Sequence, residues 1–443
     1  MTRKIILLAL IVNCQLSIVN CLASDTVKHV KTGLTFGALP AIAFDTDIGF
    51  KYGALVNFYL FGDGSTYPKY LHSFYVEWNR TTKGSGLMQF IYDSEYLIPK
   101  IRLTAEASYF TEQNLDFYGF NGYQAWYNPN FRDQDHSDYI SRVFYSHDRR
   151  VLRLRSDFQG PIIGKKFRWL GGFEYNGFKV ATVDIDKLNK GKNDKDKLPD
   201  VPLLYDHFVE WGVIKEEEKD GGNHTTFKFG LVYDTRDNEP NPMSGMWSEI
   251  ILLTAPSFTG NKPAYSKLIM THRHYFTLVD EVLNLAVRLS YQPKIGGTIP
   301  FYALPYAYNT SVNILRDGLG GAKTMRGILR NRVVGEDIFY GNVELRWKFL
   351  QIYKKQYIYF ALSPFLDFGK VTRGYEYTYN VGVDNPFLTE WRANSEKEKM
   401  HFSYGLGISG ALNHNFVAHV NYGRAVDKRD GKSGLYIGLN YLF

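Results

Sequence analysis

Hydrophobic and polar residues alternate with a period of two along much of the chain, which is the pattern of β-strands with one apolar and one polar face. Residues 339–349 show it most fully, with Phe339, Gly341, Val343, Leu345, Trp347 and Phe349 on one face and Tyr340, Asn342, Glu344, Arg346 and Lys348 on the other. Segments 227–236, 358–369 and 435–443 alternate similarly, and the last groups Tyr441 and Phe443 with its apolar residues. Alternation alone does not distinguish a transmembrane barrel from a soluble sandwich, because both bury one face of each strand.

The lengths of the connections do distinguish the two folds. Sixteen strands are predicted, near residues 34–44, 49–61, 70–79, 86–96, 101–113, 142–158, 166–180, 225–236, 244–258, 264–278, 282–292, 337–349, 355–371, 400–411, 415–424 and 433–443. Every long connection follows an odd-numbered strand, at 114–141, 181–224, 293–336 and 372–399, whereas connections after even-numbered strands are short. Long loops on one rim and tight turns on the other are typical of outer-membrane barrels. We therefore predict an all-β fold, a 16-stranded antiparallel transmembrane β-barrel in the bacterial outer membrane.

The first part of the chain agrees with this location. Residues 1–23 have the basic start, apolar centre and small-residue exit of a secretory signal peptide, and a short segment, 24–33, separates them from the barrel predicted over 34–443. Both cysteines, Cys14 and Cys21, fall in the signal, and lipidation of Cys21 remains an alternative. Beyond the signal no uninterrupted apolar run reaches the about 18 residues that a membrane helix needs.

Composition and charge narrow the expected partners. Aromatic residues make up 16% of the chain, yet its mean hydropathy is −0.28, so the aromatics are interleaved with polar residues. The net charge of +7 is spread along the chain without a basic stripe, so we expect no nucleic-acid partner. The expected partners are outer-membrane lipids, including lipopolysaccharide, and other outer-membrane or periplasmic proteins. The charged segment from 184 to 222 is interpreted as a solvated external loop.

No motif predicts catalysis, a metal site or a cofactor. "GLGISG" at 405–410 matches G-x-G-x-x-G but lies inside an alternating strand, where a dinucleotide site would need a strand-to-helix turn. The chain lacks H-E-x-x-H and G-x-S-x-G, so we predict no catalytic residue and no enzyme activity. A barrel that acts on lipids as an enzyme is kept as the least favoured alternative.

Three segments resemble the barrel domain of the bacterial surface antigen superfamily, the BamA/TamA-type outer-membrane assembly factors. The first is "VYDTRDNEPNPMSG", a strand–turn–strand motif that contains Asp234, Arg236, Asp237, Pro242 and Gly245. The second is "GGAKTMRGILRNRVVGEDIFYGNVELRWKF", and the third is "FLDFG", Phe365 to Gly369. The chain also ends on an aromatic residue, Phe443, as members of the family do. The resemblance covers about 225–443 well.

The resemblance implies a re-entrant loop between strands 11 and 12. Arg326 would turn back into the lumen and pair with carboxylates on the wall, and the alternation already places Glu344 and Asp367 on inward faces of neighbouring strands. Gly327 would allow the close turn, Gly320 and Gly321 the loop's re-entry, and Phe365 and Gly369 would flank Asp367. Met325 precedes the arginine, and the family's aromatic residue after Gly327 is Ile328 here.

The expected function is assistance with insertion, assembly or export of proteins at the outer membrane. Tyr441 and Phe443 would form the C-terminal barrel signal, with Phe443 anchoring the last strand at the periplasmic interface. The barrel pattern begins near Leu34, which leaves no room for the periplasmic POTRA domains of the best-known members and puts direct protein insertion in doubt. The alternatives are a passive pore or a structural partner barrel of an envelope complex.

Overall fold

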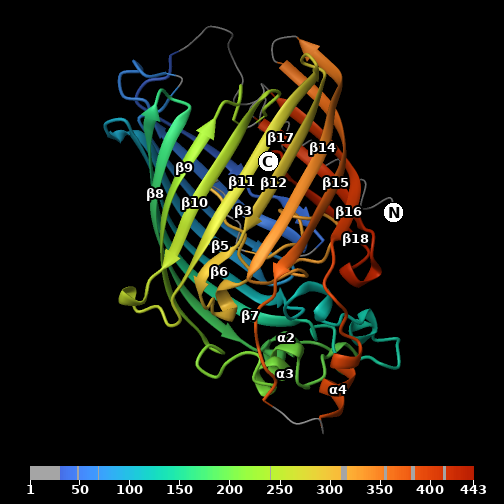
Figure 1. Cartoon of the computed structure of the whole chain (residues 1–443). Helices are drawn as coiled ribbons and strands as arrows, with labels where there is room; N and C mark the ends of the chain where they lie inside the picture. Colours follow the sequence, from blue (N-terminus) through green and yellow to red (C-terminus); the bar gives the residue numbers. More distant parts are fainter. Residues whose placement is uncertain are drawn as a thin grey trace.

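The computed structural model describes residues 30–46, 49–67, 69–239, 241–310, 317–353, 357–380, 385–412 and 416–443. The signal peptide predicted over 1–23 lies outside these residues. All strands belong to one antiparallel sheet that closes on itself into a barrel, as Figure 1 shows. The prediction of a 16-stranded barrel is confirmed: eighteen strand segments form sixteen barrel strands, because the first is divided into β1 and β2 and the eleventh into β12 and β13.

The strands of the first half are β1 Leu34–Pro40, β2 Ala43–Asp45, β3 Gly49–Leu60, β4 His72–Thr81, β5 Ser85–Ile98, β6 Ile101–Asp116, β7 Ser146–Ile163, β8 Phe167–Ala181 and β9 Gly221–Asp234. Those of the second half are β10 Gly245–Ala255, β11 Tyr265–Val279, β12 Leu283–Gln292, β13 Lys294–Gly297, β14 Asp337–Tyr353, β15 Tyr357–Arg373, β16 His401–Leu412, β17 Phe416–Ala425 and β18 Ser433–Leu439. Each strand pairs with its neighbour in sequence, so the barrel is a meander.

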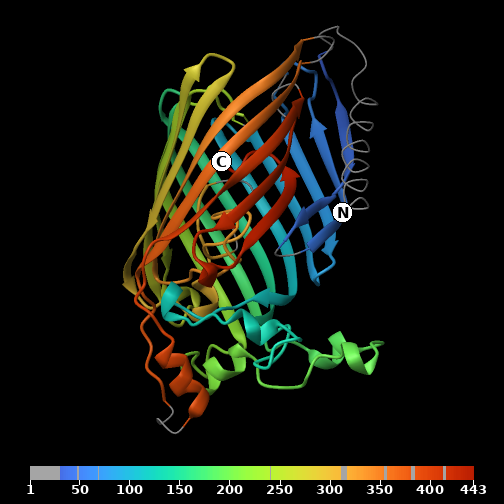
Figure 2. The same cartoon turned by 90° about the vertical axis from the view of Figure 1, so that its right-hand side faces the viewer.

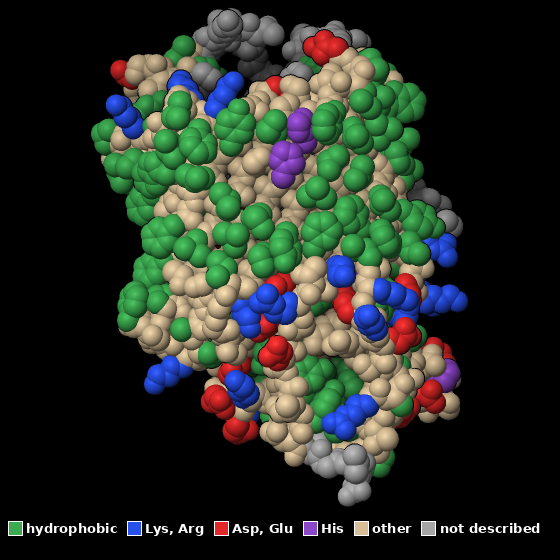
Figure 3. Space-filling view, in the orientation of Figure 1, with side chains coloured by type: hydrophobic (Ala, Val, Ile, Leu, Met, Phe, Trp, Pro, Cys, Tyr) green, Lys and Arg blue, Asp and Glu red, His purple; other side chains and the backbone are tan. Residues whose placement is uncertain are grey.

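The two faces of the wall differ as the alternation predicts. On β14, Trp347 and Phe349 are exposed on the outside, whereas Glu344 and Arg346 are buried on the lumen side. Figure 3 shows the outer surface as a broad hydrophobic band, with most Lys, Arg, Asp and Glu side chains gathered below it. A wall with an apolar outer face and a polar inner face suits a barrel surrounded by lipid.

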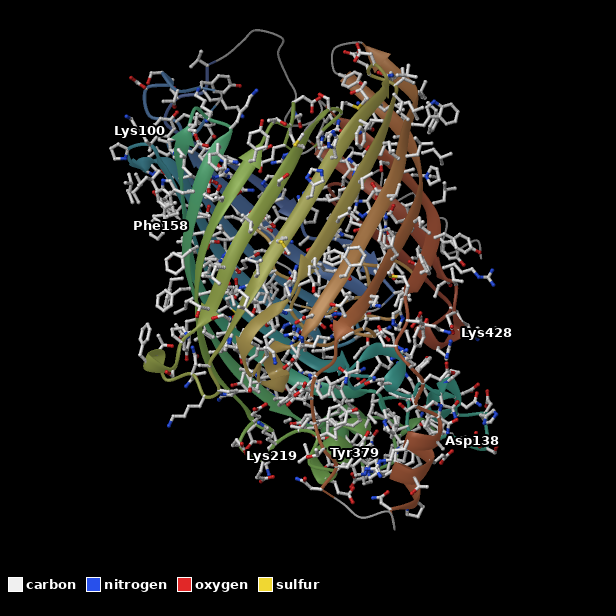
Figure 4. The ribbon with its side chains drawn as sticks, in the orientation of Figure 1. Lys100, Asp138, Phe158, Lys219, Tyr379 and Lys428 are labelled. Atoms are coloured by element: carbon white, nitrogen blue, oxygen red, sulfur yellow. The ribbon has the colours of Figure 1, made fainter. Side chains whose placement is uncertain are left out.

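Three of the four long loops fold together into a cap at one rim. The cap comprises residues 117–145, 182–220, 374–380 and 385–400, and it contains the helices α2 Ile185–Asn189, α3 Leu204–Glu210 and α4 Pro386–Ala393. Figure 1 shows all three helices at one end of the barrel, and Figure 4 places Asp138, Lys219 and Tyr379 there, whereas Phe158 lies on the outer wall. The segment 184–222 is therefore not a wholly solvated loop, because Phe208 and Trp211 are buried in the aromatic core of the cap.

The barrel closes through a short seam between its first and last strands, which lie beside each other in Figure 2. Strand β18 pairs with β2 through Tyr436 with Asp45 and Ile437 with Phe44. Thr46 adds a backbone hydrogen bond to Leu435 O at 3.1 Å. Strand β1 pairs with β3 along its whole length and with no other strand of the described residues. We call the contact between β18 and β2 the seam.

The end of the chain leaves the wall, which corrects the strand predicted over 433–443. β18 ends at Leu439, and Asn440 adopts a positive φ of 65°. The last residues therefore turn into the lumen, where Phe443 is only 7% exposed. The period-two pattern of the sequence continues to Phe443, but the left-handed residue breaks the alternation of faces that the pattern implies.

Candidate functional site: an arginine-pinned loop in the lumen

The connection between β13 and β14 re-enters the barrel. We call its described part after the gap, residues 317–336, the lumen loop; Figures 1 and 2 both show it inside the barrel. Isolated bridges join Leu319 to Val333 and Gly321 to Met325, so the loop doubles back on itself. Gly320 and Gly321 have φ of 111° and 78°, values that L side chains rarely adopt. At Gly320 a Cβ would also lie 2.0 Å from Leu329 O.

Arg326 joins the tip of this loop to the barrel wall. Its Nε and Nη2 donate to the two carboxylate oxygens of Asp367, each at 2.9 Å, and its backbone N–H donates to the same carboxylate at 2.9 Å. Its Nη1 donates to Glu344 Oε1 at 2.6 Å. The guanidinium carbon lies 3.5 Å from the centre of the Phe365 ring. One planar cation thus bridges β14 and β15, which is the bidentate geometry that arginine favours.

The charges in this group are buried, so their pairing matters energetically. Burial by itself lowers the pKa of Arg326, but Asp367 and Glu344 raise that pKa above its ordinary value, so the guanidinium stays charged. Asn342 donates to Asp367 Oδ1 at 2.8 Å and to Thr324 O at 2.7 Å, which ties the loop backbone to the same carboxylate. A buried pair of this kind is costly to break, because the remaining ion is left without a partner or water.

The backbone beside Arg326 packs directly on the wall. Gly327 has a φ of 90°, and a Cβ there would lie 2.5 Å from the backbone of Gly423 on β17. The contact is reciprocal, since a Cβ on Gly423 would lie 2.6 Å from Arg326 O. Met325 is fully buried, and a Cβ on Gly369 would lie 2.8 Å from its sulfur. Glycines on both sides therefore allow the loop tip to lie flush against the wall.

Two further arginines of the loop, which the sequence reasoning missed, bind other parts of the molecule. Arg330 Nη2 donates to Glu112 on β6 at 2.5 Å and to Asp317 at 2.7 Å. Arg332 donates to the carbonyl oxygens of Gly122 and Ala125 in the cap at 2.8 and 3.1 Å. Three arginines within seven residues thus connect the loop to β14 and β15, to β6, and to the cap. Their spacing in "RGILRNR" is a signal in the sequence that could have indicated this role.

A second buried polar group lies where the cap meets the barrel. His401 donates through Nδ1 to the Asp430 carboxylate at 2.7 Å, and its Nε2 lies 3.2 Å from Glu398 Oε1. The Tyr123 hydroxyl donates to Asp430 at 2.6 Å, and its ring stacks on His401 with centroids 4.0 Å apart. Arg332 also approaches Asp430, at 3.8 Å. This group fixes the cap to β16 and to the β17–β18 connection.

The strand–turn motif forms the β9–β10 turn on the opposite rim, away from the cap. Arg236 binds Asp234 through Nε and Nη2, each at 2.9 Å, and Asp237 accepts from the Met243 backbone at 3.0 Å. Pro242 O accepts from Asn284 at 3.1 Å. Gly245 has a φ of 92°, and a Cβ there would lie 2.3 Å from Thr235 O. These residues shape the turn and are not in contact with Arg326.

The aromatic rings of Tyr441 and Phe443 lie against the guanidinium group of Arg346 in the lumen. Arg346 lies 4.1 Å from the centre of the Tyr441 ring, and its Nη2 donates to Phe443 O at 2.9 Å. The same guanidinium binds Glu344 at 2.9 Å, so Arg346 and Arg326 share that carboxylate, and Arg346 connects it to the chain end. Phe443 was expected at the periplasmic interface, but the structure places it inside the barrel.

The site is a network of ion pairs and hydrogen bonds that joins the lumen loop to the barrel wall and to the cap. Within the described ranges, no group of three His, Cys, Asp or Glu side chains is placed to hold a metal ion. None of the helices in the described part of the chain has the length and apolar character to cross a membrane. What the site provides is a plug held by buried ion pairs between a cap at one rim and the chain end within the lumen.

Comparisons with known proteins show which family has this architecture. Residues 81–443 match the family model described as the Omp85 superfamily domain. Among solved structures, a form of BamA from Haemophilus ducreyi lacking POTRA domains 1–3 is similar, with a TM-score of 0.53, 12% identity and coverage of 93% of this chain and 71% of that chain. CdiB from Escherichia coli also has a TM-score of 0.53, with 11% identity and coverage of 93% of this chain and 63% of that chain.

These identities are low, so the two structures support the fold alone, and this chain spans less than two thirds of the CdiB chain. No curated protein matches the sequence. The family model covers most of the chain, including the strand–turn motif, the lumen loop and the last strand. The barrel is thus one of the bacterial outer membrane, and the chain belongs to the Omp85 superfamily.

Proposed function

We propose that this barrel assists the insertion, assembly or export of polypeptides at the outer membrane by opening at its seam. The observation that carries the proposal is the contrast in strand pairing. β3 pairs with β4 from Lys51 to Leu60, whereas β18 and β2 pair through Tyr436 with Asp45 and Ile437 with Phe44, beside the hydrogen bonds of Thr46 with Leu435. Few backbone hydrogen bonds have to break for the barrel to open there, and lipid-facing backbone groups that lose partners strongly favour a new strand.

The lumen loop supports the proposal because it binds strands of the wall that lie away from the seam and also contacts the seam strand β18. Arg326 fixes β14 and β15, and Arg330 binds Glu112 on β6. The loop tip reaches the seam side of the barrel through Gly327, whose N–H donates to the Tyr436 hydroxyl of β18 at 3.1 Å. A displacement of the loop would therefore alter a hydrogen bond to β18, the strand that closes the barrel.

A disulfide across the seam tests the proposal. Phe44→Cys and Ile437→Cys lie in register, and in cells depleted of the native protein their oxidised pair should lower the levels of particular outer-membrane or surface proteins. Reductant should restore those levels. The control is Val76→Cys with Phe90→Cys, which joins β4 to β5, also in register, and should have no effect. A seam disulfide that forms completely and leaves the surface proteome unchanged contradicts the proposal.

The passive-pore alternative is less compatible with the packing. Leu319, Met325 and Val333 of the lumen loop are fully buried inside the barrel, and the cap covers the rim from which the long loops leave. A large, steady conductance through the purified barrel would favour a pore. Clients and partner subunits would be identified by affinity purification from intact envelopes, which also tests a role as a structural partner of an envelope complex.

A further inference from the structure

Two arginines lie directly opposite each other across β11 and β12. Arg273 and Arg288 are register partners in the antiparallel pair, and both side chains face the lumen, 7% and 2% exposed. Like charges at directly opposed positions destabilise a sheet, and burial of a cation without a counter-charge is costly. Such a pair needs a compensating anion.

Among the residues that the structure describes, no carboxylate forms an ion pair with either arginine, although Glu249 lies near enough to attract Arg273. Arg273 makes no ion pair or hydrogen bond with the described residues, and its Nε is buried without a partner. Arg288 donates to neutral oxygens only, at Asn342 Oδ1 and Lys323 O, at 2.8 and 3.2 Å. Glu249, on β10, accepts from the Thr310 backbone N–H at 3.1 Å through Oε2, while its Oε1 is buried without a hydrogen bond.

Other arginines of the lumen near these two form ion pairs, so the lack of an ion pair sets Arg273 and Arg288 apart. Arg102 binds Asp93 at 2.9 Å, and Arg168 and Arg236 bind Asp234 at 3.4 and 2.9 Å. The terminal residue Phe443 lies nearby with its ring 5.0 Å from the Arg288 guanidinium carbon, but its carbonyl oxygen accepts from Arg346. Arg273 and Arg288 are left as two guanidinium groups without an ion-paired carboxylate.

The two arginines line a cavity with room for a ligand. The cavity has a volume of about 450 Å³ and is also lined by Lys323, Trp247 and the chain end. Trp247 lies under Arg273, with 3.9 Å between its ring centre and the guanidinium carbon. Stacking fixes the plane of the guanidinium, which leaves its N–H edge to bind an oxyanion.

We propose that Arg273 and Arg288 form a binding site for a phosphate group inside the barrel. Two guanidinium forks suit a tetrahedral phosphate group, whose oxygens point in several directions, better than a planar carboxylate. The group would belong either to a free phosphate compound in the aqueous lumen or to a phospholipid headgroup. This site is independent of the proposed assembly function, since none of its residues lies at the seam.

Inorganic phosphate is the first probe, titrated into the purified full-length barrel in zwitterionic detergent at constant ionic strength. Trp247 is the reporter, because an anion on Arg273 changes the field at its ring, and Trp247→Phe identifies its share of the fluorescence. We expect a saturable change that weakens at least tenfold in Arg273→Gln and Arg288→Gln. The control Arg102→Gln removes a paired arginine from the same cavity and should respond as the unaltered protein does.

The second probe is a nanodisc of phosphatidylcholine with or without phosphatidylglycerol. A response to phosphatidylglycerol that depends on Arg273, without one to free phosphate, assigns the site to a lipid headgroup, and the converse assigns it to a soluble phosphate. If Arg273→Gln does not fold, Arg273→Lys keeps the charge, loses the planar fork and should still weaken binding. An unsaturable response, or the same response in every variant to both probes, overturns the proposal.

Discussion

Arg326 and Asp367 are joined by three hydrogen bonds, two from the guanidinium and one from the arginine's own backbone N–H. The side chain and the main chain of one loop residue thus converge on a single carboxylate of β15. Such a contact fixes the path of the loop as well as the position of the charge. It makes the loop tip the point at which the plug is most sensitive to substitution.

Arg326→Ala should lower the free energy of unfolding by about 3–5 kcal/mol, because Asp367 would be left buried without a cation, with only Asn342 and the backbone N–H of residue 326 as donors. Arg330→Ala should cost less, since Arg149 still binds Glu112 at 2.6 Å. Urea unfolding of the purified barrel, followed by the shift between folded and unfolded mobility on gels, measures both. Equal losses for the two variants would show that the number of remaining partners does not set the cost.

Gly423→Ala should displace the lumen loop without changing any charge. The new Cβ would lie 2.6 Å from Arg326 O, which is backbone and has little freedom to move. Gly410→Ala is the control on the neighbouring strand, where the nearest atom would be 3.4 Å away on the Phe360 ring. Protease cleavage within residues 317–336 should rise in Gly423→Ala only. Resistance equal to that of the unaltered protein would mean that the wall adjusts instead.

Arg326→Ala should also raise the conductance of the barrel in planar bilayers. Without its anchor the loop tip moves within the lumen, but Arg330 and Arg332 still hold the loop to β6 and the cap. We therefore expect frequent brief openings rather than a steady large current. Arg150→Ala, which removes a 47% exposed arginine side chain from the wall, serves as the control and should not change the currents. Currents that do not respond to Arg326→Ala would argue that the cap alone closes the barrel.

The cap should loosen at mildly acidic pH. Burial lowers the pKa of His207 on α3 below the ordinary value of 6.5, and the hydrogen bond with Glu210 only partly opposes this. Below pH 6.5 the unfolded cap binds a proton on His207 that the folded cap does not yet bind. The stability of the cap therefore falls as the pH is lowered from 6.5 toward the pKa of His207 in the folded protein. Limited proteolysis of residues 182–220 at pH 7.5 and 5.5 should show the change. His207→Phe keeps the ring contact with Trp211 and should remove most of this pH dependence.

Much of the fold was predictable because the sequence of a barrel in lipid has to follow a regular pattern of apolar and polar residues. A transmembrane strand has to alternate, and long loops are tolerated at one rim, so Glu344 and Asp367 could be assigned to the lumen and their strands to neighbouring positions. The cap was not predictable in this way. Its packing depends on aromatic residues such as Trp211 and Trp391 that are far apart in sequence and carry no periodic signal.

The candidate site shows the same division. The contacts of Arg326 followed from a motif and from the parity of two strands, whereas Arg330 and Arg332 bind partners that only the three-dimensional path of the loop brings near. The position of Phe443 was mispredicted, because one residue in a left-handed conformation, Asn440, is enough to redirect the chain. Sequence alternation reports which side chains are apolar but does not report where a strand stops.

The inward turn at Asn440 also determines what the first strand offers to its surroundings. Because the chain end enters the lumen, no described strand pairs with the free edge of β1, and Leu34 and Phe36 are 63% and 68% exposed. Its backbone N–H and C=O groups on that edge form a template onto which an extended segment can add by β-augmentation. Over Leu34–Pro40, the wall therefore has an exposed strand edge whose main-chain groups have no strand partner among the described residues.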